Sequence, residues 1–482
     1  MTKLYPNTSN IPQGRTLLPL AAALSAALAL AACAPIPQLK PAAQAIDASQ
    51  LGLPAQTSPA PSELTRASAW WVALRDPQLD TIIQRTLAQS PSLAAARARI
   101  DRAEAQIESA KAADRVTVGA GFDATYQRFP EHSLYPPPYG GSLRTMSTVQ
   151  GEVHYDWDFF GRHAAELNMA LGQAKAGEAD QAAAALMLSA QVARSYLALG
   201  RVLAQKTLLT QQINEREEAL SLVRQRVVAG LDNAQDKRTA ESPLPELRRQ
   251  ALVLDEQAGA LRQMLASLSV QDASALRELA PKLPQTLPMA AQGPGLDLLG
   301  RRPDVIAARW RVEAAGHQVA LARSQFYPNV SLSAFAGYSA IGLDKLLQAG
   351  SLQYGLGPSI RLPLFDTGRL SAQLQGSAAE VDAAVAAYNG AVLDAVRDAS
   401  DQLRTVQSLQ EQQREQANLL QNAQASTELQ TQRFNAGLGN KLAVLNAHGA
   451  VLQQQRMALD LQGQLLESQV SLVRALGGDW HE

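Results

Sequence analysis

Four segments of the chain alternate hydrophobic and polar side chains with a period of two. They cover residues 116–127, 147–159, 329–339 and 352–363. Strict alternation predicts β-strands that have one apolar and one polar face. Each segment is about as long as a tilted strand that crosses a bilayer, which needs roughly 9–11 residues. A soluble antiparallel sheet with one solvated face would show the same pattern, so the strands alone leave both interpretations open.

Long stretches without proline follow each pair of strands. Residues 162–229 and 369–436 contain no Pro, and at a rise of 1.5 Å per residue each predicts a helix of up to about 100 Å. Apolar residues between Val381 and Val392 recur at spacings of three and four, which is typical of coiled-coil seams. Abundant Ala allows close packing on a second face. We therefore expect helices with neighbours on two sides, either in the wall of a tube or in a solid rod.

The two strand-and-helix units resemble each other in sequence. Residues 91–99 (PSLAAARAR) match residues 303–311 (PDVIAARWR), and residues 226–233 (RVVAGLDN) match residues 433–440 (RFNAGLGN). Several matches in the same order indicate a tandem internal duplication. We assign a first repeat to 64–275, a proline-rich crossover to 276–294, a second repeat to 295–478 and a tail to 479–482.

The N-terminus has the pattern of an export signal. Residues 1–32 carry Lys3 and Arg15 before an apolar stretch that ends at Leu30-Ala31-Ala32-Cys33. This motif resembles a bacterial lipobox, so we expect a covalent lipid on Cys33. Ala34, rather than Asp, follows, as in lipoproteins sorted to the outer membrane. The alternative is an ordinary signal peptide with an incidental Cys. Residues 33–63, rich in Pro, Ala and Gln, predict an extended tether.

Composition excludes several functions. The chain has 482 residues, with 43 Lys and Arg against 44 Asp and Glu, and this near-neutral balance argues against a nucleic-acid binder. A single Cys rules out a disulfide framework and CxxC zinc sites. No apolar run of about 18 residues follows the signal, so no transmembrane helix is predicted. The six His show no metal-ligand spacing, and no Walker, GxSxG or GxGxxG motif occurs, so we expect no enzyme activity and no cofactor apart from the lipid.

The predicted strands raise a problem of closure. Four strands cannot close a barrel, and an open sheet edge is not tolerated in lipid. Several chains would have to share one barrel, and a conducting pore needs three or more because eight strands leave an interior filled by side chains. The polar strand face would then line the lumen. Its acids make the lumen acidic and cation-favouring by hypothesis: Asp123, Glu152, Asp156 and Asp158.

Both long helices are expected to end at the same three-residue turn. Gly directly after a helix favours a left-handed cap. The Leu that follows gains nothing from capping, and its repetition indicates that both tips present an apolar contact to a partner. The residues of the two tips are Ala229, Gly230, Leu231, Ala436, Gly437 and Leu438.

Seven motifs, spread over nearly the whole mature chain, resemble the outer-membrane efflux protein family of the TolC/OprM type, and within it the NodT-like lipoproteins. They are Leu30 to Cys33, Trp70-Trp71, Asp76 to Leu79, Arg301 to Val305, Phe326 to Leu332, Leu362 to Arg369 and Ala475 to Trp480. The run from Asp156 to Arg162 resembles members that work with major-facilitator pumps.

The resemblance implies a mainly helical protein with membrane β-structure. It implies a homotrimer whose 12-stranded β-barrel in the outer membrane is continued by a periplasmic α-helical barrel. The implied function is a passive exit duct of a tripartite pump for drugs or small molecules. An inner-membrane RND or MFS transporter supplies the energy, and a periplasmic adaptor contacts the helical tips.

The resemblance also points to a gate. Relatives often carry acids near the second-repeat turn that narrow the periplasmic entrance, but here Gly439 occupies that turn. Asp232 supplies an acid in the first repeat instead, either as a candidate gate residue or as a solvated cap residue. Two other functions remain open: an exit channel for type I protein secretion, and a periplasmic coiled-coil lipoprotein scaffold without a channel. The exported compounds cannot be named from the sequence.

Overall fold

The computed structural model describes residues 37, 42–46, 69–132, 134–284, 298–363 and 365–478. They fall into two compact units, which we describe separately. The sheet unit contains the described residues of Met1–Gln44, Glu104–Gly172 and Val312–Ala384, and the helical unit contains those of Ala45–Ala103, Gln173–Arg311 and Val385–Glu482. The signal 1–32, Cys33 and the tail 479–482 lie outside the described residues, as do most of the tether and of the crossover.

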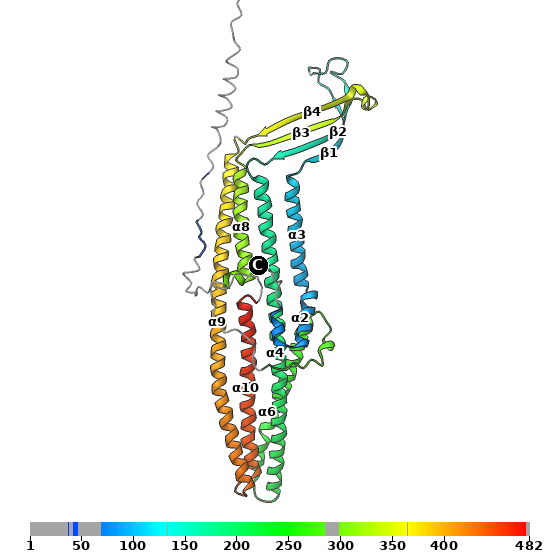
Figure 1. The fold of residues 1–482 in the computed structure, drawn as a ribbon. Coiled ribbons are helices and arrows are strands. Elements are labelled where there is room, and N and C mark those ends of the chain that lie inside the picture. The colour runs from blue at the N-terminus through cyan, green and yellow to red at the C-terminus, as the bar shows by residue number, and fades with distance from the viewer. Residues whose placement is uncertain are drawn as a thin grey trace, which may run out of the picture. The chain divides into compact units, whose positions relative to one another are not determined.

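The sheet unit contains one antiparallel sheet whose four strands follow the order β1-β2-β3-β4 (Figure 1). The strands lie close to the four alternating segments, with shifted ends: β1 is Thr117–Arg128, β2 is Leu143–Trp157, β3 is Asn329–Ile341 and β4 is Leu352–Arg361. The central pair joins the two halves of the chain, because Gly151 of β2 is opposite Ala336 of β3. Strands β1 and β4 are left at the two edges of the sheet.

The register sorts the side chains onto two faces. Directly opposed residues in an antiparallel pair point to the same side. Val118 is opposite Val153, and Val153 is opposite Ala334, so the apolar positions of neighbouring strands coincide. Thr148 is likewise opposite both Asp123 and Ser339 on the other side. The alternation in the sequence therefore produces one apolar and one polar face across all four strands.

Short lengths of four helices complete the sheet unit. They belong to α3 (Pro91–Ala113), α4 (Arg162–Val228), α8 (Pro303–Ser324) and α9 (Thr367–Asn435). Phe326, just after α8, packs with Leu370 and Leu374 of α9. Helices α4 and α8 approach closely, because a Cβ on Gly172 would lie 3.1 Å from that of Ala314. Small residues at this contact allow the backbones to meet.

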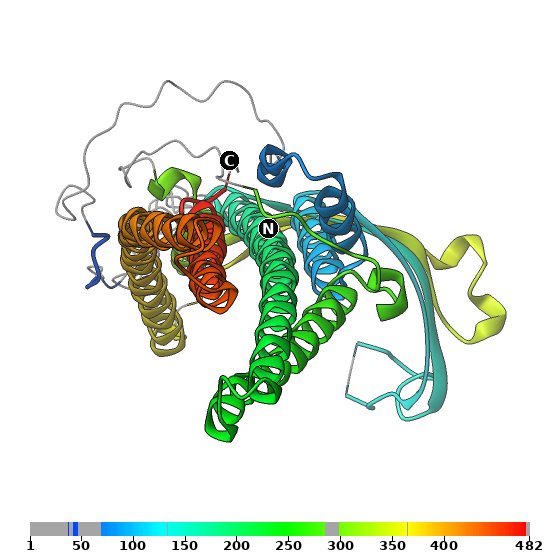
Figure 2. The same ribbon diagram turned by 90° about the horizontal axis from the view of Figure 1, so that it is seen from below.

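The helical unit holds the longest elements of the chain. Helix α4 has 67 residues and α9 has 69, as the proline-free stretches predict. Side by side in Figures 1 and 2, α9 and α10 form one pair, joined by Val406, Leu409, Leu465 and Leu472. The remaining elements of this unit are η2 (Trp70–Leu74), α2 (Pro77–Gln89), α5 (Ala234–Glu241), α6 (Pro243–Leu268), η3 (Ala273–Leu276), α7 (Leu298–Arg301) and α10 (Lys441–Ala475).

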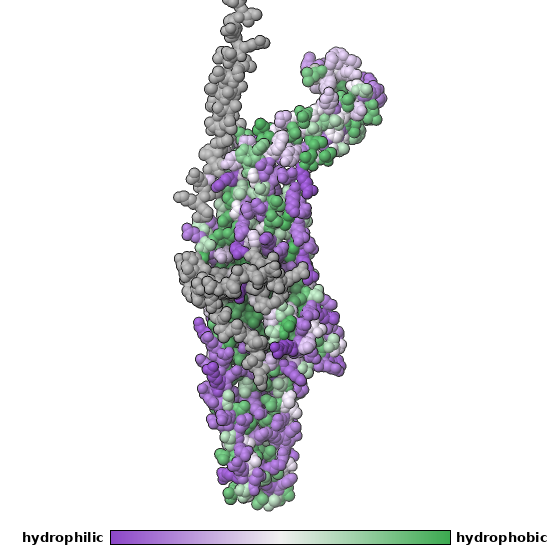
Figure 3. Space-filling view, in the orientation of Figure 1, coloured by the Kyte–Doolittle hydropathy of each residue, from purple (hydrophilic) through white to green (hydrophobic). Residues whose placement is uncertain are grey.

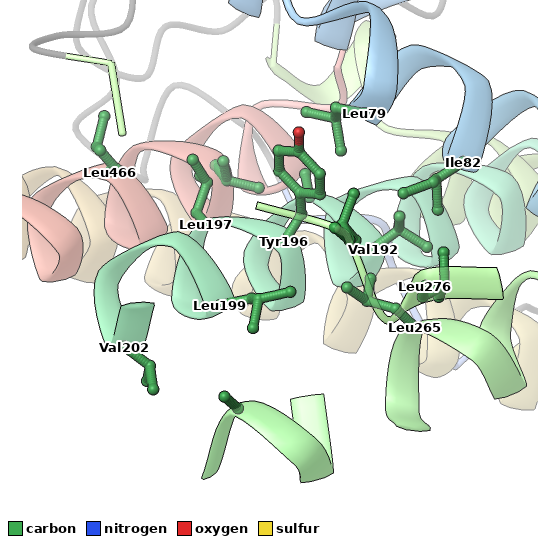
Figure 4. Close-up of a cluster of buried hydrophobic side chains, with 14 of the residues drawn as sticks. Leu79, Ile82, Val192, Tyr196, Leu197, Leu199, Val202, Leu265, Leu276 and Leu466 are labelled. Carbon is green, nitrogen blue, oxygen red and sulfur yellow. The ribbon is translucent and has the colours of Figure 1, made fainter. Parts of the chain in front are cut away.

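The main core of the helical unit gathers side chains from α2, α4, α6, η3 and α10 (Figure 4). Tyr196 at its centre is 1% exposed, and its hydroxyl donates to Asp76 Oδ2 at 2.8 Å. Burial raises the pKa of Tyr196, so the hydroxyl stays protonated and keeps donating. Asp76 Oδ1 in turn accepts from the backbone N–H of Gln78 and caps α2. This motif residue therefore fixes α2 to α4.

A second motif residue ties three helices together. Arg302 is only 7% exposed and forms a bidentate pair with Asp304 at the start of α8. The same guanidinium donates to the backbone carbonyl of Ala475 at the end of α10 and approaches Asp398 of α9. Its buried charge is satisfied by hydrogen bonds on several sides, as burial requires. The role of this motif is structural.

The order of helix, two strands and long helix occurs twice, as α3-β1-β2-α4 and as α8-β3-β4-α9. Among the described residues, α4 is the one helix that is long and apolar enough to cross a membrane. The sequence led us to expect none. Core helices of water-soluble proteins share this composition, and 44% of the apolar window of α4 is buried within the structure.

Candidate channel wall and helical tips

The polar face of the sheet carries three of the four predicted lumen acids. Glu152 is opposite Gly119 and Phe335, and it accepts a hydrogen bond from Gln150. Asp156 accepts from the side-chain amide of Asn329 at 3.3 Å, and His154 Nε2 lies 3.4 Å from it. Together with Asp123, these residues share one side of the sheet. A polar network therefore runs across the strands on the face predicted to meet water.

Asp158 lies outside the strand in which the sequence analysis placed it. Strand β2 ends at Trp157, one residue before it, and the chain then turns at Gly161, whose φ is +71°. The carboxylate of Asp158 instead accepts from the backbone N–H groups of Arg162 (2.6 Å) and His163 (3.1 Å). These donors have no partner within a helix, so Asp158 caps α4. The alternation in the sequence continued beyond the end of the strand.

Two arginines occupy the same polar face as the acids. Arg144 is opposite Gln127 at one end of the sheet, and Arg361 is opposite Asn329 at the other. The sequence reasoning counted only the acids. The acidic part of the face is therefore bounded by a cation at each end.

The opposite face exposes large apolar side chains. Val118 is 76% exposed, Tyr354 79%, Leu356 73% and Ile360 72%. An apolar surface of this extent marks a membrane or protein contact. Aromatic residues gather where β2 leads into α4: Trp157 and Phe159 are exposed, and Phe160 stacks on Tyr327 with ring centroids 4.7 Å apart. Aromatic residues at strand ends are typical of the boundary between lipid and water.

The two helical tips have the same backbone geometry. Gly230 and Gly437 both have a φ of +73°. Leu231 donates its N–H to the carbonyl of Arg226 at 2.8 Å, and Leu438 donates to that of Arg433 at 2.8 Å. This six-to-one bond around a left-handed glycine is the Schellman motif, which any residue with a Cβ would strain. The sequence expectation of a glycine cap agrees with this geometry.

Apolar side chains are exposed at both tips. Leu231 is 68% exposed, Leu438 74% and Val228 90%. Figure 3 shows hydrophobic residues at this end of the helical unit, among hydrophilic ones. After each turn an Asn caps the next helix: Asn233 accepts from the N–H groups of Gln235 and Asp236, and Asn440 accepts from Ala443. The repeated Leu therefore points outward from a rigid turn.

The first tip has an ion pair that joins the end of its helix to its own turn. Arg226 donates to both carboxylate oxygens of Asp232 at 2.8 Å. These hydrogen bonds and the charge of Arg226 hold the pKa of Asp232 below its usual range. In the second tip, Gly439 occupies the equivalent position, and Arg433 has no acidic partner among the described residues. The arginine partner of Asp232 was missed from the sequence, as was the short helix α5, which the capping box Asn233–Asp236 signals.

A groove of about 350 Å³ lies beside the first tip. Arg226, Asp232 and Asp236 line one side of it, and Asn440 and Asn446 at the start of α10 line the other. Apolar side chains complete the lining of the groove, among them Val223, Pro243 and Leu442. No cluster of three metal-ligating side chains occurs among the residues described by the structure.

Comparison with known proteins agrees with this geometry. The sequence profile of the outer membrane efflux protein family matches residues 82–269 and 296–478. The multidrug resistance outer membrane protein MdtP of Shigella flexneri is 32% identical over 427 residues, which cover 85% of this chain and 86% of MdtP. The putative multidrug resistance outer membrane protein MdtQ of Escherichia coli strain K12 is 31% identical, over 94% of this chain and 96% of MdtQ.

A solved structure has the same fold. The crystal structure of the outer membrane protein VceC of Vibrio cholerae superimposes with a TM-score of 0.76 and 33% identity, over 86% of this chain and 99% of VceC. The profile match covers most of both halves of the chain, and the relatives match along almost their whole length. The chain therefore belongs to the outer membrane efflux protein family.

Proposed function

We propose that the chain is the outer-membrane channel component of a tripartite pump, a passive exit duct for drugs or other small molecules. Membership of a transport family and relatives named for multidrug resistance support this function. The observation that carries the proposal is the four-stranded sheet, which has a polar face, an exposed apolar face and two edges within one chain.

In a homotrimer, the two edge strands of each four-stranded sheet would pair with the edge strands of the neighbouring chains. Three copies of four strands make a barrel of 12, in which β4 of one chain pairs with β1 of the next and no edge meets lipid. The apolar face of Tyr354 and Leu356 would then contact the membrane, while Glu152 and Asp156 would line the lumen. We propose that the periplasmic α-helical barrel is formed by α3, α4, α6, α8, α9 and α10. We also propose that the repeated order of elements arose by a tandem duplication.

The partners follow from the tips and from the N-terminus. We propose that a periplasmic adaptor docks on Leu231 and Leu438 and on the groove beside the first tip, and that an inner-membrane RND or MFS transporter drives export. The charge balance leaves no role for nucleic acid. Cys33 is proposed to carry the lipid that anchors the chain to the outer membrane. The duct needs no catalysis of its own, because the transporter uses the energy source.

We also propose that Asp232 is a gate residue of the periplasmic entrance. Its bidentate pair with Arg226 lies within its own turn, so breaking that pair is the step by which it would act on the periplasmic entrance.

The proposal is tested by deleting the gene and measuring drug accumulation in cells. We expect accumulation to rise and to return to normal with the wild-type chain, and we expect native mass spectrometry of the detergent-extracted protein to give three chains. Unchanged accumulation of every drug together with secretion of a protein substrate would instead support a type I secretion channel. A monomer without transport would support the scaffold.

A further inference from the structure

A cavity of about 640 Å³ lies within the helical unit, where α4, α6, α9 and α10 meet (Figure 1). This volume is in the range of pockets that hold drug-sized ligands. Amide side chains from all four helices make up most of its polar lining: Gln205, Gln212, Gln250, Gln416 and Gln453. Because amides are uncharged, the charge of the cavity depends on its two other polar residues, Arg456 and Asp460.

The charge of Asp460 is already paired. Its Oδ1 accepts from Nη1 of Arg201 at 2.8 Å and from Nε2 of Gln205 at 3.1 Å. Its Oδ2 accepts from Nε2 of Gln464 at 2.7 Å. Both carboxylate oxygens are therefore engaged, and the ion pair with Arg201 neutralises them. The remaining charge of the lining is the cation of Arg456.

Arg456 has no anionic partner among the residues that the structure describes. Its Nη1 donates to the amide oxygens of Gln212 and Gln250 at 3.5 and 3.3 Å, which is long for a hydrogen bond between nitrogen and oxygen. Its Nε is shielded from solvent and has no acceptor. Burial lowers the pKa of Arg456, but arginine stays charged in proteins. A buried cation without a counter-charge is unfavourable until an anion binds beside it.

From this arrangement we propose that the cavity binds an organic carboxylate with an apolar body, and that Arg456 recognises the carboxylate. We call this cavity the Arg456 site. Nε and Nη2 have no acceptor among the described residues, and they form the edge of the guanidinium that holds a carboxylate through two parallel hydrogen bonds. The amide nitrogen of Gln212 supplies a further donor, because the amide oxygen already faces Arg456.

The apolar part of the lining fits the body of such a ligand. Leu247 of α6 and Met457 and Leu461 of α10 line the same cavity. Met457 and Leu461 are four residues apart and so lie on one side of α10, and a flexible methionine adapts to ligands of different shape. An inorganic anion would leave this wall uncovered. The inference goes beyond the proposed duct, because binding at the Arg456 site requires no transport.

The site is tested by calorimetric titration of the full-length protein in lipid nanodiscs. The probe is hydrocinnamate, and its amide is the uncharged match. We expect saturable binding of the carboxylate, and binding at least about tenfold weaker for the amide. Arg456→Gln should weaken carboxylate binding at least about tenfold and remove the preference over the amide. Arg456→Lys keeps the charge but not the parallel donors, so its affinity should be intermediate.

A matched control and the thermal midpoint separate binding from a structural role. Arg414→Gln removes the same charge from an exposed position of α9 and should leave binding unchanged. Because the cation is unpaired in the free protein, Arg456→Gln should not lower the midpoint of the free protein. The carboxylate should raise the midpoint of the wild type but not of Arg456→Gln.

Four results would overturn the Arg456 site. The first is no saturable binding of the carboxylate to the wild type, as expected if a carboxylate side chain of a neighbouring chain already fills the cavity. The second is equal binding of the amide, and the third is unchanged binding in Arg456→Gln. The fourth is a lower thermal midpoint of free Arg456→Gln, which would show that the cation stabilises the fold without a ligand.

Discussion

The turns at 229–233 and 436–440 share a backbone but differ in charge. Both end a long helix with a Schellman motif, in which a glycine has a φ of +73° and a leucine follows. Asp232 binds Arg226 in the first turn, whereas Gly439 leaves Arg433 without a carboxylate beside it in the second. The shared geometry agrees with one requirement common to both tips, for which we propose partner docking. The difference indicates a role that only one tip has.

The largest effect is expected when both tips are changed together. The Gly230→Asp/Gly437→Asp double variant places a Cβ at a left-handed φ and a charge in an apolar contact at each tip, so we expect export to be abolished while trimers remain intact. Drug accumulation and native mass report the two outcomes. Full efflux by this variant would contradict docking at the tips.

A milder change tests the side chains of the tips while leaving their backbone geometry intact. Leu231→Ser and Leu438→Ser keep both glycines but remove an exposed apolar contact, so each should weaken co-purification of the adaptor severalfold. Leu419→Ser is the matched control, because Leu419 is an exposed leucine of α9 outside the turn. If the control weakened adaptor binding as much as the tip variants do, the contact would not be specific to the tips.

Because the two turns have the same backbone geometry, the same substitution should destabilise both by the same free energy. Gly230→Ala and Gly437→Ala each force a Cβ into the same left-handed conformation, which costs about 1 kcal/mol. We expect both variants to increase the local hydrogen exchange of their own turn by a similar factor. Neither added Cβ would meet another atom within 4 Å, so strain alone is measured. A difference of tenfold or more would show that the turns are not equivalent.

The charge difference predicts a pH dependence in one turn only. The pKa of Asp232 is lowered in the fold, so its contribution is complete above the usual Asp pKa of about 3.9 and is lost as pH falls through the lowered value. Hydrogen exchange, corrected for its intrinsic pH dependence, should accelerate in residues 228–233 on acidification but not in residues 435–440. Asp232→Asn should abolish this dependence, and its persistence in that variant would assign it to another group.

The smallest effect is expected when an Arg–Asp ion pair like that of the first turn is introduced into the second turn. Gly439→Asp offers Arg433 a carboxylate, and the added Cβ would lie 3.3 Å from the backbone nitrogen of Phe434, so a shift of a few tenths of an ångström accommodates it. We expect the acid dependence to appear in the second turn. If Asp232 also gates the entrance, Asp232→Ala should raise the closed-state current and Gly439→Asp should lower it. An unchanged current in Asp232→Ala would remove Asp232 from the gate.

The features that could be predicted from the sequence are local ones. Alternation located the four strands, and the glycines after the proline-free stretches located the two turns, because each signal is contained in a few consecutive residues. Asp158 was misplaced because alternation does not show where a strand ends. Arg226 was missed as a partner because it lies a full turn and a half before Asp232, across a change of backbone direction.

Single-channel recording of the purified protein in a planar bilayer tests the central claim most directly. The proposed trimer has a continuous polar lumen, so we expect discrete conductance steps. Permeability should be higher to cations than to anions, because the acids of the polar face (Asp123, Glu152 and Asp156) outnumber its arginines (Arg144 and Arg361). Absence of conductance at every voltage and pH, from protein shown to be trimeric and inserted, would contradict a channel and favour the scaffold.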